Sequence, residues 1–198
     1  MLRHPPGPIG SGGGTFTEDT MSYVSLIART DATGATRELL DQIDGAFGAT
    51  PAMFRAVANS PAALRSMWGS FQALGAGELG PALGELIAVA VANRNGCEYC
   101  LAAHTGLGRK AGLTDAALVA AQLGESDDPK TTALLALALA LVDQRGQVSD
   151  AQFEAARAHG WTDGELVELV AQVALNLFTN YVNIALRVPV DFPVVALR

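Results

Sequence analysis

The two cysteines of the chain lie close together, and a histidine follows them one helical turn later. Cys97 and Cys100 are three positions apart, and His104 comes four positions after Cys100. Offsets of three, four and seven residues fall on one face of an α-helix, so the three side chains would form one reactive stripe. The thiolate is the reactive form of cysteine, and a neighbouring base favours it. The stripe therefore predicts nucleophilic or redox thiol chemistry.

The residues around the first cysteine predict that a helix begins there. Asn95 is a favourable N-cap residue, and Glu98 stands at the position from which a side chain can return a hydrogen bond to the cap. This arrangement would place Cys97 in an exposed first turn, where the positive end of the helix dipole favours a thiolate. His104 would then take or share the proton of Cys100.

One carboxylate stands in the apolar segment directly before the cysteines. Glu85 lies within residues 83–92, where every other residue is apolar or glycine. Burial of an unpaired charge is costly, so Glu85 either reaches the surface or has a hydrogen-bonded partner. Because a short turn separates this segment from the cysteines, Glu85 could face them and act as a proton acceptor in series with His104.

The rest of the chain is punctuated in the manner of helices. Capping residues or first-turn prolines open the segments, and glycines close them. We therefore predict an all-α protein, with a flexible Pro-, Gly- and Ser-rich tail over residues 1–20 and a single domain over residues 21–198. The predicted helices lie near residues 36–47, 51–58, 61–75, 81–93, 96–111, 114–123, 129–145, 149–159 and 163–187.

Composition argues against several classes of protein. A chain of 198 residues with 49% hydrophobic content can bury a core without a stabilising disulfide, and cysteines so close together would stabilise little. A net charge of −7 argues against a nucleic-acid partner. The longest apolar run, residues 133–142, is too short to cross a bilayer and is typical of a helix inside a bundle or a subunit interface. Without an export signal near Met1, we expect a cytoplasmic protein with no membrane partner.

A polar stripe runs along the last predicted helix. Gln172, Asn176, Asn180 and Asn183 recur at helical spacing. Such a stripe is more typical of a solvated face. Amides are uncharged, however, and asparagine is unfavourable inside helices, so a substrate cavity or a subunit interface lined by these residues is the alternative.

Taken together, Glu85, Cys97, Cys100 and His104 resemble the core motif of the carboxymuconolactone decarboxylase family in its alkyl hydroperoxidase D (AhpD-like) branch. The resemblance covers roughly residues 45–195 and is with the peroxidase-related subgroup. It departs at Tyr99, where AhpD proper has a histidine. Tyrosine can donate a hydrogen bond but is a poor base near neutral pH.

The resemblance implies a helical homo-oligomer that reduces peroxides with thiols. Cys100 would attack the terminal peroxide oxygen, and Cys97 would resolve the resulting sulfenic acid as a disulfide. Glu85 and His104 would move the protons. No cofactor is implied beyond this redox-active disulfide, and a lipoyl or thioredoxin-like protein would supply the electrons.

Other functions stay open at this point. Cys97, Cys100 and His104 could supply three ligands to a catalytic zinc, with Glu85 or water as the fourth. Decarboxylating members of the family lack the cysteine pair, which counts against lactone decarboxylation. The fold could also serve as a non-enzymatic redox sensor or partner-binding protein, and peroxide turnover with a dithiol donor would separate that role from catalysis.

Overall fold

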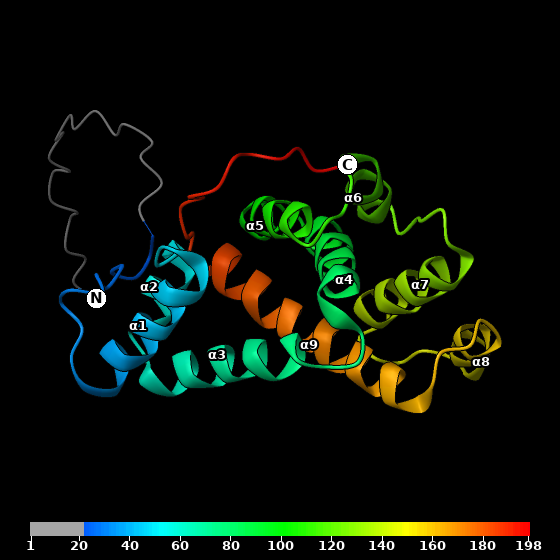
Figure 1. The fold of residues 1–198 in the computed structure, drawn as a ribbon, viewed down its shortest axis with the longest axis horizontal. Coiled ribbons are helices and arrows are strands. Elements are labelled where there is room, and N and C mark those ends of the chain that lie inside the picture. Colours follow the sequence, from blue (N-terminus) through cyan, green and yellow to red (C-terminus); the bar gives the residue numbers. More distant parts are fainter. Residues whose placement is uncertain (1–21) are drawn as a thin grey trace, which may run out of the picture.

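The computed structural model describes residues 22–198, which form nine α-helices and no β-strand (Figure 1). The all-α prediction is confirmed, and every predicted helix is present with its ends displaced by two residues or fewer. The predicted tail over residues 1–20 lies outside the described residues. The helices are α1 (Gly34–Phe47), α2 (Ala52–Val57), α3 (Pro61–Gly75), α4 (Gly80–Arg94), α5 (Glu98–Lys110), α6 (Asp115–Gln122), α7 (Pro129–Asp143), α8 (Asp150–Ala158) and α9 (Asp163–Ala185).

Helix α4 is the central element of the bundle. It contacts α3, α5, α6, α7 and α9, and its residues from Leu86 to Ala92 are all buried (Figure 1). A helix that is apolar on every side is stable only when neighbours cover all of its faces. Helix α4 therefore fixes the positions of α5 and α9, which carry most of the candidate site.

Helix α7 contains the all-round apolar run of residues 133–142. All of its leucines are buried, among them Leu134, Leu135 and Leu137, and the helix packs against α4, α8 and α9. The sequence allowed this run to lie either inside a bundle or in a subunit interface. The structure places it inside the bundle.

The end of α4 forms a tight turn that leads directly to the cysteines. Gly96 has a φ of 69°, the left-handed conformation that glycine adopts most readily. The backbone N–H of Gly96 donates to the carbonyl of Asn93 at 3.1 Å, and that of Cys97 donates to the carbonyl of Ala92 at 2.9 Å. This hydrogen-bond pattern is a Schellman C-cap, and Asn95 is therefore the residue that ends α4.

The start of α5 differs from the prediction. Cys97 itself is the N-cap, and its sulfur accepts a hydrogen bond from the backbone N–H of Cys100 at 3.3 Å. The predicted Asn95 cap and the first-turn position of Cys97 were wrong, because the left-handed Gly96 separates Asn95 from the new helix.

Helices α4 and α5 approach each other closely at a glycine. A Cβ atom placed on Gly108 would lie 2.6 Å from Leu118 Cδ2 and 3.6 Å from Glu85 Cβ. A larger residue would collide with Leu118 of α6, whereas its contact with Glu85 of α4 would be an ordinary one. Gly108 lies one turn after His104, so this close approach brings His104 next to Glu85.

Helix α9 packs across α4 and α5 and is the longest helix of the described part. It begins at a capping box, in which Thr162 Oγ1 accepts from the N–H of Glu165 at 3.2 Å and Glu165 Oε2 accepts from the N–H of Thr162 at 2.8 Å. The chain then returns past α5 and ends near α6, where the N–H of Arg198 donates to Asn93 Oδ1 at 2.9 Å (Figure 1).

Among residues 22–198, no helix combines the length and the apolar character needed to cross a membrane.

Candidate active site

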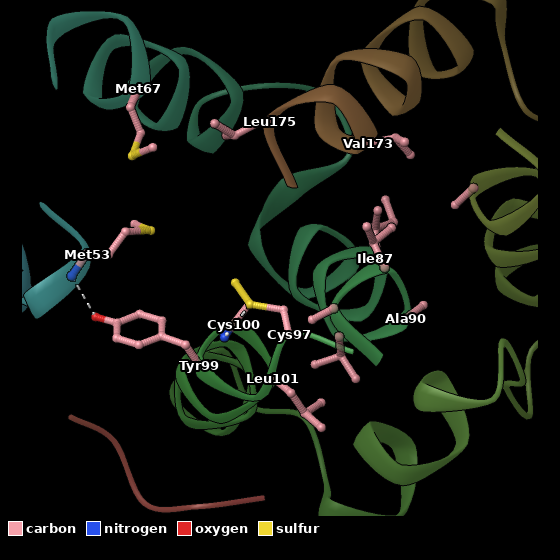
Figure 2. Close-up of a cluster of buried hydrophobic side chains, with 14 of the residues drawn as sticks. Met53, Met67, Ile87, Ala90, Cys97, Tyr99, Cys100, Leu101, Val173 and Leu175 are labelled. Atoms are coloured by element: carbon pink, nitrogen blue, oxygen red, sulfur yellow. Dashed lines mark hydrogen bonds between the residues drawn. A yellow bond between two sulfur atoms is a disulfide. The ribbon is translucent and has the colours of Figure 1, made fainter. Parts of the chain in front are cut away.

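Cys97 and Cys100 form a disulfide at the N-terminal end of α5 (Figure 2). Both are buried, with exposed fractions of 1% and 2%. The predicted exposure of Cys97 is therefore wrong. As the N-cap, its side chain folds back over the N–H of Cys100, and the neighbouring helices cover it. In this conformation a partner protein cannot contact either sulfur directly.

Glu85 and His104 are joined across the interface between α4 and α5. Glu85 Oε2 lies 2.8 Å from His104 Nδ1, and the two side chains are 19% and 11% exposed. Glu85 was expected either to reach the surface or to have a hydrogen-bonded partner, and the structure shows that it has the partner. A carboxylate that accepts from Nδ1–H fixes the imidazole tautomer and leaves Nε2 free to accept a proton. The carboxylate also stabilises the imidazolium that proton uptake would form.

Cys100 and His104 line one small cavity, here called the Cys100 cavity, of about 30 Å³. That volume is enough for a water-sized group such as a peroxide oxygen pair. Cys97 is not among the lining residues. A small reactive group in the cavity would therefore meet Cys100 before Cys97. Five of the wall residues carry phenyl or phenol rings: Phe47, Phe54, Phe71, Tyr99 and Phe192.

Asn183 of α9 faces the same sulfur. Its Nδ2 donates to Cys100 Sγ at 3.2 Å, and the residue is 4% exposed. A hydrogen-bond donor at sulfur favours the charged thiolate over the neutral thiol. The site thus holds Cys100 between a base on its own helix and an amide donor from another helix.

The whole polar stripe of α9 is buried, so the interpretation as a solvated face was wrong. Gln172, Asn176, Asn180 and Asn183 are all less than 9% exposed. The physical reason is that α9 packs this side against α4 and α5. Asn95 Nδ2 donates to Asn180 Oδ1 at 2.8 Å, which ties the turn before the cysteines to α9. Asn176 and Asn183 line cavities, as the alternative interpretation of the stripe proposed.

Tyr99 has a structural contact in place of the histidine that AhpD proper carries. Its hydroxyl accepts from the backbone N–H of Met53 at 3.1 Å and points from α5 toward α2 (Figure 2). Its ring meets Phe192 edge to face, with centroids 5.5 Å apart. Burial raises the pKa of the Tyr99 phenol far above its ordinary value. The phenol therefore stays protonated at neutral pH.

Tyr99→Phe should destabilise the protein without changing the reaction. The buried N–H of Met53 would lose its acceptor, which should lower the free energy of unfolding by about 1 to 3 kcal/mol. Above about pH 10, the unfolded chain releases a phenol proton that the folded chain retains, so wild-type stability should fall as pH rises. Tyr99→Phe should lack this contribution. Urea unfolding of both proteins at neutral and alkaline pH measures this contribution. If both proteins lost the same stability at alkaline pH, the raised pKa of Tyr99 would be contradicted.

Most wall residues of the Cys100 cavity were not predicted as site residues, and Phe47 and Phe192 are examples. Phe47 ends α1 and Phe192 lies in the C-terminal segment, so they are far apart in the chain. No local pattern connects them. The only sequence evidence that Phe47 and Phe192 belong to the site was that both lie in the segments that resemble the family.

Within the described part of the chain, no group of three or more His, Cys, Asp or Glu side chains is arranged to hold a metal ion. The zinc alternative needs both sulfurs as separate thiolates, whereas here they are bonded to each other.

The model of the carboxymuconolactone decarboxylase family matches residues 61–126. This stretch includes Glu85, both cysteines and His104, and the match confirms the resemblance to this family that these residues carry. A search of curated proteins finds no match.

Solved structures with a similar fold include peroxidase-related proteins. A peroxidase-related protein from Ralstonia eutropha with an alkylhydroperoxidase AhpD core is 25% identical, with a TM-score of 0.76 over 86% of this chain and 92% of that chain. A peroxidase-related protein from a Silicibacter species is 21% identical, with a TM-score of 0.75 over 92% and 96%. A C82A variant of the debrominase Bmp8, solved in complex with 2,3,4-tribromopyrrole, is 19% identical, with a TM-score of 0.74 over 85% and 91%. The last two similarities concern the fold alone.

Proposed function

We propose that this protein is a thiol-dependent peroxidase that cycles Cys97 and Cys100 between dithiol and disulfide. The observation that carries the proposal is the placement of Cys100: it is bonded to Cys97, hydrogen-bonded by Asn183, and shares a cavity with a histidine held by a carboxylate. The family match and the AhpD core of the Ralstonia protein support it.

The first step oxidises Cys100. His104 takes the thiol proton, and the thiolate attacks the terminal oxygen of the peroxide. The O–O bond breaks, Cys100 becomes a sulfenic acid, and the leaving alkoxide receives the proton from His104 and departs as an alcohol. Glu85 stabilises the imidazolium between these two transfers, and the amide of Asn183 stabilises the thiolate before attack.

The second step closes the disulfide. Cys97 attacks the sulfenic sulfur of Cys100, the S–O bond breaks, and hydroxide takes the Cys97 proton and leaves as water. The pair has then supplied two electrons to one peroxide. An external dithiol, a lipoyl or thioredoxin-like protein, returns them in a reducing compartment such as the cytoplasm. The burial of both sulfurs favours a donor with a slender arm, because a flat protein surface cannot reach them.

A steady-state peroxidase assay with lipoyl and thioredoxin-type donors in parallel tests the proposal. We expect donor oxidation that depends on both peroxide and this protein. Oxidation of the cysteine pair once, with no turnover by either donor, would instead identify a redox sensor.

A second candidate reaction is reductive removal of halogen from an aromatic ring. The aromatic walls of the Cys100 cavity favour it, and the fold is shared with a debrominase. Cys100 would take the halogen, the ring carbon would take a proton, and Cys97 would displace halide to form the same disulfide. Halide release from a bromopyrrole in the presence of a dithiol would distinguish this reaction from peroxide reduction.

We also propose that a second copy of the chain covers α9. Val167, Val170, Tyr181 and Ile184 are 71%, 43%, 61% and 46% exposed, and their spacing places them along one face of the helix. An apolar face of this length is typical of a subunit interface.

Light scattering should therefore give a mass well above the 20.5 kDa of one chain. Ile184→Glu should shift the protein toward the monomer, because a charge at an apolar interface loses its hydration. Val194→Glu, at an exposed position outside α9, is the matched control. A monomer at micromolar concentration in the unmodified protein would contradict this proposal.

A further inference from the structure

A second cavity adjoins the Cys100 cavity at His104. Its volume is about 280 Å³. Glu85 is one of its lining residues, and we call it the Glu85 cavity. The two cavities share four wall residues: Phe47, Phe71, His104 and Leu107. A molecule could therefore place a small reactive group against Cys100 and a larger body in the Glu85 cavity.

The apolar walls of the Glu85 cavity suit a flat or short organic body. Trp68 and Phe71 come from α3, Leu107 from α5 and Leu175 from α9. Burial of apolar area of this kind is the main source of affinity for small ligands.

Two buried amides are among the polar groups that line the same cavity. Gln172 and Asn176 are 8% and 4% exposed, and both line the cavity. Asn176 Nδ2 donates to the backbone carbonyl of Gln172 at 2.9 Å, but no hydrogen bond to another described residue engages the Gln172 side chain. The Gln172 amide lines the cavity and is engaged by no described residue, so it is available to hydrogen-bond to a ligand there.

The charge of the cavity restricts that ligand. Glu85 is the one acidic residue of its wall, and no lysine or arginine lines it. An anionic body would be desolvated beside a carboxylate, which is unfavourable. An uncharged hydrogen-bonding group has no such cost.

We propose that the Glu85 cavity is the binding site for the organic body of the substrate, an uncharged aryl or short alkyl group whose polar atoms hydrogen-bond to Gln172 and Asn176. The identity of the reacting group, a hydroperoxide, rests on the proposed function. The binding site itself rests on the cavity and its amides.

Gly84 provides a way to fill this cavity without touching the cysteines or His104. It lines the cavity from α4, and a Cβ atom there would meet only Gln172 Nε2, at an ordinary 3.6 Å. Gly84→Leu should therefore extend into the cavity. Gly45→Leu is the matched control, because Gly45 is exposed on α1 and a Cβ atom there would meet nothing within 4 Å.

The binding test uses 2-phenyl-2-propanol, the unreactive alcohol of cumene hydroperoxide, and follows Trp68 in the cavity wall by fluorescence. We expect saturable binding to the reduced wild-type protein and to Gly45→Leu, with affinity at least about tenfold weaker in Gly84→Leu. Gln172→Met keeps the side-chain length and removes the amide, so it should also weaken binding. Phenylacetate, which carries a charge, should not compete. No binding to the wild type, or equal binding to Gly84→Leu in a folded protein, would overturn the proposal.

Kinetics separate this proposal from the proposed function. Gly84→Leu should lower kcat/KM for cumene hydroperoxide by about tenfold and leave that for hydrogen peroxide, which has no organic body, nearly unchanged. Equal losses for both substrates would overturn the assignment of the cavity. If neither peroxide is turned over but the alcohol still binds as expected, the peroxidase function fails and the binding site stands.

Discussion

Cys100→Ser should lose peroxidase activity by at least about 1,000-fold, whereas Cys97→Ser should consume one equivalent of peroxide and then stop. The reason is the difference in access between the sulfurs. Cys100 lines the cavity beside His104, and Cys97 does not line it. Without Cys97, the sulfenic acid on Cys100 has no partner with which to form a disulfide.

Dimedone-type labelling followed by mass spectrometry measures this difference. The label should appear on Cys97→Ser after one equivalent of peroxide and be absent from Cys100→Ser. Trapped sulfenic acid at Cys97 of the Cys100→Ser variant would reverse the assigned order. A zinc site would give another pattern, with metal lost equally from both variants and no sulfenic acid in either.

Glu85→Gln should lower kcat/KM for peroxide by about 10- to 100-fold at neutral pH. Glutamine keeps the shape of the side chain but carries no charge to stabilise the imidazolium of His104, 2.8 Å away. The loss should shrink as pH rises, because hydroxide then ionises the thiol without help from His104. The pH–rate profile of the variant should therefore be displaced to higher pH.

Glu38→Gln is the matched control for this experiment. Glu38 is exposed on α1 and has no part in the site. Its profile should overlay that of the wild type. Superimposable profiles for Glu85→Gln and the wild type would remove Glu85 from the proton pathway and leave it a purely structural contact of His104.

The helices were predictable because their signals are local. The Thr162–Glu165 capping box and Pro129 at the start of α7 act on adjacent residues, and the structure shows helices beginning there. The pairing of Glu85 with His104 was also within reach, since a short turn joins their helices. The same local reasoning placed Cys97 in a first turn, and it failed because Gly96 and Asn95 complete α4 before α5 begins.

The parts of the site that come from distant segments were not predictable in the same way. Asn183 lies 83 residues after Cys100, and its contact with that sulfur depends on how α9 crosses α5. Phe192 reaches the cavity from the C-terminal segment. The sequence pattern of α9 specified that one side was polar, but burial of that side is a property of the tertiary packing.

The most direct test of the peroxidase function is the reaction of fully reduced wild-type protein with one equivalent of an organic hydroperoxide, followed by intact-mass analysis and quantification of the alcohol. The account predicts one Cys97–Cys100 disulfide and one alcohol for each peroxide consumed, and full return to the dithiol on addition of a dithiol donor. Unconsumed peroxide with both thiols still reduced would contradict it.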